Sequence, residues 1–186
     1  MREEWLNRIA ITWCNRTKQR QLRQLLDRYG SATESIAHHP EMISRAAIEH
    51  AQKELDFIEK HSVQLYYYKD SNYPYRLAQC TDAPLLLYAK GNVEVNPKHV
   101  VSIVGTRMPS ERGKDWCRQL VIDLASHIPD LTIVSGLAYG IDVIAHKAAL
   151  ESGIPTIIVP AHGLDRIYPA THRNVAIQAL EMGGLL

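Results

Sequence analysis

Residues 134–149 read Val-Ser-Gly-Leu-Ala-Tyr-Gly-Ile-Asp-Val-Ile-Ala-His-Lys-Ala-Ala, and the architecture of the chain can be worked out from this stretch. It continues the apolar run Leu131–Val134, which predicts a short buried strand, and from Ile141 its apolar residues recur at helical spacing. Gly136 and Gly140 allow a tight turn with positive φ, or a close approach of two backbone segments. The first amides of a helix have no partner within that helix and attract anions. We therefore predict a strand-turn-helix corner that can bind an anion.

A second corner of the same kind comes earlier in the chain. The β-branched run Val100–Val104 predicts a strand, Gly105-Thr106-Arg107 interrupts it, and Ser110 or Glu111 begins a helix. Neighbouring parallel strands end at one carboxyl edge, where open α/β sheets bind ligands. We expect the two corners to lie together at that edge, with Arg107 projecting from its turn.

The chain from Lys98 onward alternates strands and helices, which predicts a right-handed parallel sheet of the Rossmann-like α/β class. Thr156–Val159 is the third strand, residues 160–169 form a third loop at the carboxyl edge, and a helix follows over about residues 171–180. Residues 183–186 begin a further strand. We interpret the chain as part of a longer protein with a doubly wound sheet.

Residues 1–60 predict a small helical module without a strand. Leu22 and Leu26 place an apolar stripe on one helix, which also carries Arg16, Lys18 and other basic residues. We interpret these cations as a solvated face, although they could contact phosphate. Residues 61–97 supply connecting strands and turns, and residues 98–186 form the sheet with its helices.

The composition excludes several classes of protein. The formal net charge is +1 over 186 residues, so nucleic-acid binding would need a local patch. The three cysteines lie far apart and predict reduced thiols in a cytosolic protein without a metal site. No apolar stretch is long enough to span a membrane.

Recognised catalytic motifs are missing from the carboxyl edge. The chain has no P-loop, no dinucleotide fingerprint and no nucleophile elbow. Asp142 and His146 share a helix face, and we favour a capping carboxylate bonded to a histidine over an acid-base pair. His162, Asp165 and Tyr168 remain weaker catalytic candidates whose simpler role is to shape the third loop.

This edge is better suited to hold phosphate without breaking it. Glycine amides would act together with one hydroxyl and several cations around the rim: Ser135, Arg107, Arg112, Lys114, Lys147 and Arg166. Each charge-assisted contact is worth only about 1.5–3 kcal/mol, so useful affinity requires several contacts at once. A polymer with repeated phosphates meets that requirement.

Several linked motifs between residues 60 and 186 resemble the DNA-processing protein A (DprA/Smf) family. These motifs are Tyr73-Pro74, Pro84–Tyr88, Ile103–Arg107, Val134–Asp142, Ala145-His146, Ala149-Leu150, Thr156-Ile157 and Gly163–Pro169. The resemblance implies an extended Rossmann-like domain, truncated here at its C-terminus, preceded by a helical SAM-like domain at residues 1–60.

The resemblance also implies a function. Members of the family bind incoming single-stranded DNA in the bacterial cytoplasm during natural transformation, protect it and help to load the RecA recombinase. They act without a cofactor and are not enzymes in this role. DNA phosphates would be held by Gly105-Thr106-Arg107 and by the turn 135–140, which includes Gly136, Ala138 and Gly140. The self-association surface that makes the full-length protein a homodimer would lie outside these 186 residues.

Two alternatives remain open. Related Rossmann-like folds with glycine turns cleave nucleoside monophosphates, in which case Asp142 and His146 would be the residues to test. The chain could also be a purely structural interaction domain, which would bind neither DNA nor nucleotides.

Overall fold

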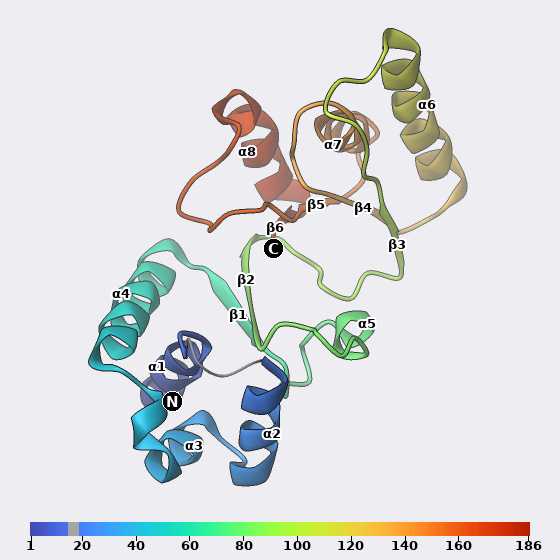
Figure 1. The fold of residues 1–186 in the computed structure, drawn as a ribbon. Helices are drawn as coiled ribbons and strands as arrows, with labels where there is room; N and C mark the ends of the chain where they lie inside the picture. The colour runs from blue at the N-terminus through green and yellow to red at the C-terminus, as the bar shows by residue number, and fades with distance from the viewer. Residues whose placement is uncertain (15–18) are drawn as a thin grey trace. The chain divides into compact units, whose positions relative to one another are not determined.

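The computed structural model describes residues 1–14 and 19–186, so Arg16 and Lys18 lie outside the described residues. The chain forms two compact units, Met1–Leu87 and Tyr88–Leu186 (Figure 1). The candidate site lies in the second unit.

The first unit begins with helices, as the sequence predicts. The helices are α1 (Arg2–Thr12), α2 (Gln19–Tyr29), α3 (Ala32–His38), the 3-10 turn η1 (Pro40–Met42) and α4 (Arg45–His61). Ser31 Oγ accepts from Glu34 N at the start of α3, and Ser44 Oγ accepts from Ala47 N at the start of α4, both at 3.1 Å. Gly30 follows the last residue of α2 with a φ of +84°, the left-handed conformation that is common in the glycine after a helix.

Strand β1 (Gln64–Tyr67) follows the helices and ends beside Leu85. Tyr68 N donates to Leu85 O at 3.0 Å, just before strand β2 (Leu86–Gly91) begins, and the short helix α5 (Tyr75–Ala78) lies between the two strands in sequence. Tyr67 and Tyr73 are buried, and Tyr73 Oη donates to Pro84 O at 2.7 Å. These two tyrosines therefore serve packing.

The second unit is the predicted parallel α/β sheet. Its strands are the end of β2, from Tyr88 onward, β3 (His99–Ser102), β4 (Leu131–Ser135), β5 (Thr156–Ile158) and β6 (Gly184–Leu185), in the spatial order β2-β6-β5-β4-β3. Strands β3 to β6 are parallel, with Val101 opposite Ile133 and Ile158 opposite Leu185, whereas β2 runs antiparallel to β6. The predicted Rossmann-like class is confirmed.

Helices α6 (Glu111–His127), α7 (Ile141–Glu151) and α8 (Arg173–Met182) connect these strands, with the 3-10 turn η2 (Ala170–His172) before α8. All three helices lie on one face of the sheet, and α7 packs against both α6 and α8 (Figure 1). The expected double winding is wrong for the described residues. Strand order advances in one direction from β3 to β6, so every right-handed crossover returns over the same face.

The core of this unit consists of two clusters under the helices. Ile103 and Ile133 pack with Val121 of α6 and Ala148 of α7, whereas Ile158 packs with the α7 and α8 residues of the second cluster. Because the parallel strands β3 to β6 are only two to five residues long, the loops that follow their carboxyl ends lie close to this core and are supported directly by it.

Candidate functional site

The loop after β3 is shaped by its own side chains. Met108 N donates to Thr106 Oγ1 at 3.2 Å, and Ser110 Oγ caps α6 by accepting from Gly113 N at 3.2 Å. The predicted start of this helix is thereby confirmed. Arg107 is exposed and, within the described part of the chain, has no ion-pair partner. Its guanidinium can therefore meet an anion from solution.

The loop after β3 contacts the start of α7, as the sequence predicts. Ile141 N donates to Thr106 O at 3.2 Å, and Val143 N donates to Ala138 O at 3.3 Å. Gly140 has a φ of +81°, and a β-carbon there would lie 2.8 Å from Arg107 Cα. The expectation that these first amides of α7 are unpaired is wrong for Ile141 and Val143, because the neighbouring loops already occupy them.

The corner between β4 and α7 is held from inside the protein. Ser135 is buried and its hydroxyl donates to Ile103 O at 2.6 Å, which joins β4 to β3. Leu137 adopts a φ of +63° with its side chain fully buried, and its carbonyl accepts from Nδ1 of the buried His172 at 2.8 Å. A non-glycine residue with positive φ is unfavourable by itself, so the core and this hydrogen bond hold the turn in place.

His146 is part of the core and lies outside any solvent-exposed site. Its Nδ1 bonds Thr156 Oγ1 at 2.7 Å, and because the Thr156 hydroxyl donates to Ile133 O at 3.0 Å, Nδ1 carries the proton. Nε2 is buried without a partner among the described residues. Burial lowers the pKa of His146 to about 4, an effect that the charge of Asp142 only partly offsets. The expected bond from His146 to Asp142 is replaced by the bond to Thr156.

The three loops at the carboxyl edge enclose one cavity of about 440 Å³. Its lining residues come from all three loops: Arg107 after β3; Gly136, Ala138 and Tyr139 after β4; and Ala161, His162, Arg166, Ile167, Tyr168 and Pro169 after β5. Two arginines from different loops thus line one cavity. Neither arginine has an ion-pair partner in the described ranges.

The predicted site residues fall into three groups. Arg107, Gly136, Ala138 and Arg166 line the cavity. Gly105, Thr106, Ser135 and Gly140 form the joint between the first two loops, where a β-carbon on Gly105 would lie 2.6 Å from Ile141 Cγ1. The remaining cations do not line the cavity: Arg112 and Lys114 lie in the first turns of α6, and Lys147 is exposed on α7. Lys114 Nζ is paired with Glu111 Oε1 at 2.7 Å.

Sequence reasoning did not single out Tyr139 as a site residue. Tyr139 is 47% exposed and lines the cavity, and its ring lies edge-on to that of His172 at a centroid distance of 5.0 Å. Tyr168, which the sequence suggested only as a weak catalytic candidate, is 68% exposed on the same cavity. The sequence did contain an indication that Tyr139 is exposed at the turn, since it stands immediately before a turn glycine and outside the apolar stripe of α7.

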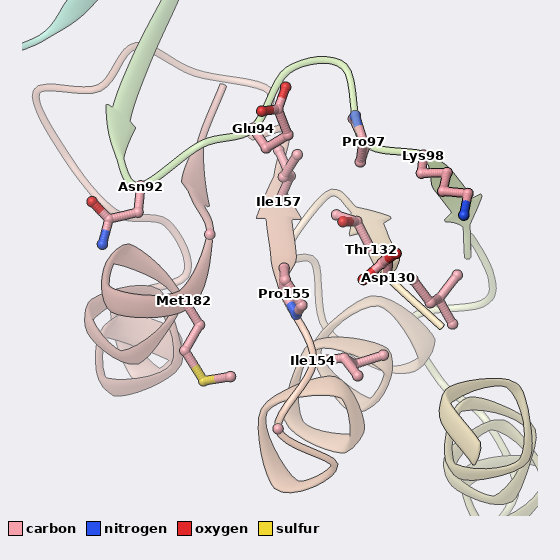
Figure 2. Close-up of a pocket in the computed structure, with 13 residues that line it drawn as sticks. Asn92, Glu94, Pro97, Lys98, Asp130, Thr132, Ile154, Pro155, Ile157 and Met182 are labelled. Carbon is pink, nitrogen blue, oxygen red and sulfur yellow. The ribbon is translucent and has the colours of Figure 1, made fainter. Parts of the chain in front are cut away.

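A second cavity, of about 420 Å³, lies where the parallel strands begin (Figure 2). Lys98, Asp130 and Thr132 line it together with Pro155 and Ile157, whereas no predicted site residue does (Figure 2). Its charged residues are of both signs. The carboxyl-edge cavity is therefore the better candidate for an anionic ligand.

Within residues 1–14 and 19–186, no group of three or more His, Cys, Asp and Glu side chains could hold a metal ion. None of the helices in these described residues combines the length and the apolar character that crossing a bilayer requires.

Comparison with known sequences identifies a family. The sequence profile described as "DNA recombination-mediator protein A" matches residues 64–186. Over 106 residues the chain is 41% identical to the DNA processing protein DprA of Streptococcus pneumoniae, covering 57% of this chain and 36% of that protein. Over 114 residues it is 40% identical to the protein Smf of Escherichia coli, covering 61% of this chain and 30% of that protein. The chain thus spans about a third of the length of these curated relatives.

Two solved structures are similar to the structure of this chain. DprA from Streptococcus pneumoniae superimposes with a TM-score of 0.70 at 27% identity, over 95% of this chain and 64% of that one. DprA from Helicobacter pylori, a structure described as showing a single-stranded DNA binding mode, superimposes with a TM-score of 0.55 at 31% identity, over 66% of this chain and 54% of that one.

Proposed function

Because the chain belongs to the DNA recombination-mediator protein A family, we propose that it binds single-stranded DNA, and that it does so at the carboxyl-edge cavity. One observation carries the proposal: Arg107 and Arg166, which lie far apart in sequence, line the same cavity as two exposed tyrosines. Phosphate and nucleobase could then be bound side by side, as a single strand requires.

The arginines would bind the phosphates. A guanidinium binds phosphate through two parallel N–H donors, and each charge-assisted bond is worth about 1.5–3 kcal/mol. Thr106 and Gly140 would act by fixing the loop of Arg107 against α7, and Ser135 by fixing β4 against β3. A longer strand would extend to the cations outside the cavity, namely Arg112, Lys114 and Lys147.

The tyrosines would bind the bases. Stacking of a base on an aromatic ring contributes about 1–3 kcal/mol and requires an unstacked base, which a duplex does not offer. Tyr139 and Tyr168 therefore favour a single strand over a duplex, and they favour no particular sequence. We assign the cavity to binding alone. Asp142 and His146, on which nucleotide cleavage would depend, are buried and do not line the cavity.

We extend the proposal to the biological role that family membership supports. The chain would act in the bacterial cytoplasm during natural transformation, protect incoming single strands and help to load the RecA recombinase onto them. Homodimerisation and the contact with RecA belong to the same proposal, and we assign neither to particular residues of this chain.

The test is a titration of the chain into fluorescent single-stranded and double-stranded oligonucleotides, followed by anisotropy over a series of salt concentrations. We expect tighter binding to the single strand. We also expect the Arg107→Ala variant to bind at least about tenfold more weakly, with a slope of log affinity against log salt that is smaller by about 0.7, since one phosphate contact is lost.

The matched control for this experiment is Arg118→Ala. This variant removes a guanidinium group of the same kind, but from the surface of α6. Arg118 is paired there with Glu151 and lies outside the cavity. We expect Arg118→Ala to bind DNA like the unmodified chain. Equal binding of single and double strands, or equal losses for the two variants, would contradict the proposed site.

A further inference from the structure

We propose that His162 is a positioning residue whose neutral form holds the third loop in its DNA-binding geometry, so that protonation of His162 weakens the binding of single-stranded DNA. The inference rests on the proposed function. It concerns a histidine that lines the cavity together with Arg107 and Arg166, although its own ring is turned toward its loop.

The two ring nitrogens of His162 bridge the loop from one end to the other. Tyr168 N donates to Nε2 at 3.1 Å, and Nδ1 contacts Gly163 O at 2.9 Å. A backbone N–H can only donate and a carbonyl oxygen can only accept. Nε2 must therefore carry the lone pair and Nδ1 the proton, which defines a single neutral tautomer.

This bridge fixes the residues that would touch DNA. Tyr168 is one of the two residues whose backbone the ring contacts, and Arg166 lies between them in sequence. Both residues line the cavity. With the bridge intact, the half-buried His162 side chain ties together the two ends of the six-residue segment from Gly163 to Tyr168. Without it, the loop would have to be ordered by the DNA itself, which reduces affinity.

Protonation removes the acceptor. An imidazolium ring donates from both nitrogens, so Nε2 would oppose the N–H of Tyr168 and keep only a contact of 3.4 Å with Tyr168 O. Imidazoles change charge between about pH 5 and 8. The bridge therefore exists only while the His162 ring is neutral, and protonation of the ring removes it.

The surrounding charges act in both directions. Arg107 and Arg166 line the same cavity and oppose a positive charge on His162, whereas Asp165, whose carboxylate lies beside Gly163, favours one. Tyr139 and Tyr168 are the other titratable groups that face the cavity. Pure electrostatics predicts that a cationic His162 attracts phosphate and strengthens binding at low pH. The positioning role predicts the opposite sign, which makes the two accounts separable.

The test measures the affinity of the chain for a fluorescent oligothymidylate at constant ionic strength from about pH 8 to pH 5.5. We expect the unmodified chain to lose about threefold to tenfold in affinity over this range, the effect of one hydrogen bond. His162→Gln keeps an acceptor for Tyr168 N but does not titrate, so we expect it to bind well and to lack this decrease. His162→Ala should bind weakly throughout, and His127→Gln, which changes an exposed histidine at the end of α6, should keep the unmodified profile.

The outcomes separate the two proposals. If the unmodified chain shows no binding at pH 8, the proposed function fails. If it binds at pH 8 but its affinity rises or stays constant toward pH 5.5, or if His162→Gln shows the same decrease, the role of His162 is overturned. Nitrogen-15 spectra of the imidazole at pH 8, without DNA, give an independent result: we expect the Nδ1–H tautomer, and an Nε2–H tautomer would contradict the bridge.

Discussion

Ile141 donates its backbone N–H to the carbonyl oxygen of Thr106 at 3.2 Å, so the first residue of α7 is bonded to the loop that carries Arg107. Two corners from different crossovers thus form one rigid joint. The joint closes because Gly140 has no side chain. Any β-carbon at that position would overlap Thr106 O and lie 2.7 Å from the carbonyl carbon of Arg107.

We predict that Gly140→Ala destabilises the protein more than the replacement of a glycine that has positive φ but open space around its α-carbon. Gly140 has a φ of +81° and a ψ of −127°, a combination that favours glycine, so alanine would be strained there by about 1–3 kcal/mol before any overlap is counted. The overlap with the backbone of Thr106 and Arg107 adds to this, and we expect a total decrease of about 3 kcal/mol or more in the free energy of unfolding. Urea denaturation measures the change.

Gly153→Ala provides the control for this substitution. Gly153 has a φ of +69°, but a β-carbon there would have no heavy atom within 4 Å. We expect it to lose only the backbone contribution of about 1–2 kcal/mol. If both variants lost the same free energy of unfolding, the close contact of Gly140 with the backbone of Thr106 and Arg107 would be contradicted.

We predict that Tyr139 binds a base and not a phosphate. Tyr139→Ala should weaken binding to oligothymidylate by about fivefold or more, because stacking contributes about 1–3 kcal/mol. An oligonucleotide of the same length with abasic sites has the phosphates but no rings to stack. On this probe the variant and the unmodified chain should bind equally.

The control here is Trp116→Ala, which removes another exposed aromatic side chain, 68% exposed on α6 and outside the cavity. It should bind both oligonucleotides like the unmodified chain. If Tyr139→Ala weakened binding to the abasic probe as strongly as to oligothymidylate, the tyrosine would act on the backbone or on the loop, and the stacking role would be wrong.

The parts of the fold that depend on local patterns could be predicted from sequence. Val100–Val104 and Leu131–Val134 are runs rich in β-branched apolar residues. The first overlaps β3, which ends at Ser102, and the second lies in the adjoining parallel strand β4. Ser110 caps α6 as its residue type suggests. Parallel neighbours must end at one edge, so the meeting of Arg107 with Gly136 followed from topology alone.

The remaining features depend on contacts between distant residues. Nothing local to Leu137 indicates a positive φ, because the residue is held there by its burial and by His172, which lies 35 positions later. The partner of Ile141 N could not be predicted from the helix alone, since Thr106 approaches from the preceding crossover. The sequence also could not show that all three helices cover one face of the sheet. The handedness of a crossover fixes the face that its helix covers only once the strand order is known.

We predict that the protein loses stability between about pH 6.5 and pH 4 because of His146. Burial lowers the pKa of this group to about 4 in the folded protein, against about 6.5 when the chain is unfolded. Above pH 6.5 the ring is neutral in both states and has no effect on the pH dependence. As the pH falls from 6.5 toward 4, the unfolded state takes up a proton that the folded state excludes, so the free energy of unfolding decreases, by up to about 3 kcal/mol.

Urea midpoints measured across this range should fall less steeply for His146→Gln, whereas His127→Gln, at an exposed histidine, should follow the unmodified chain. A His146→Gln variant with an unchanged pH slope would mean that the imidazole titrates normally, and hence that it is not sealed in the core beside Thr156.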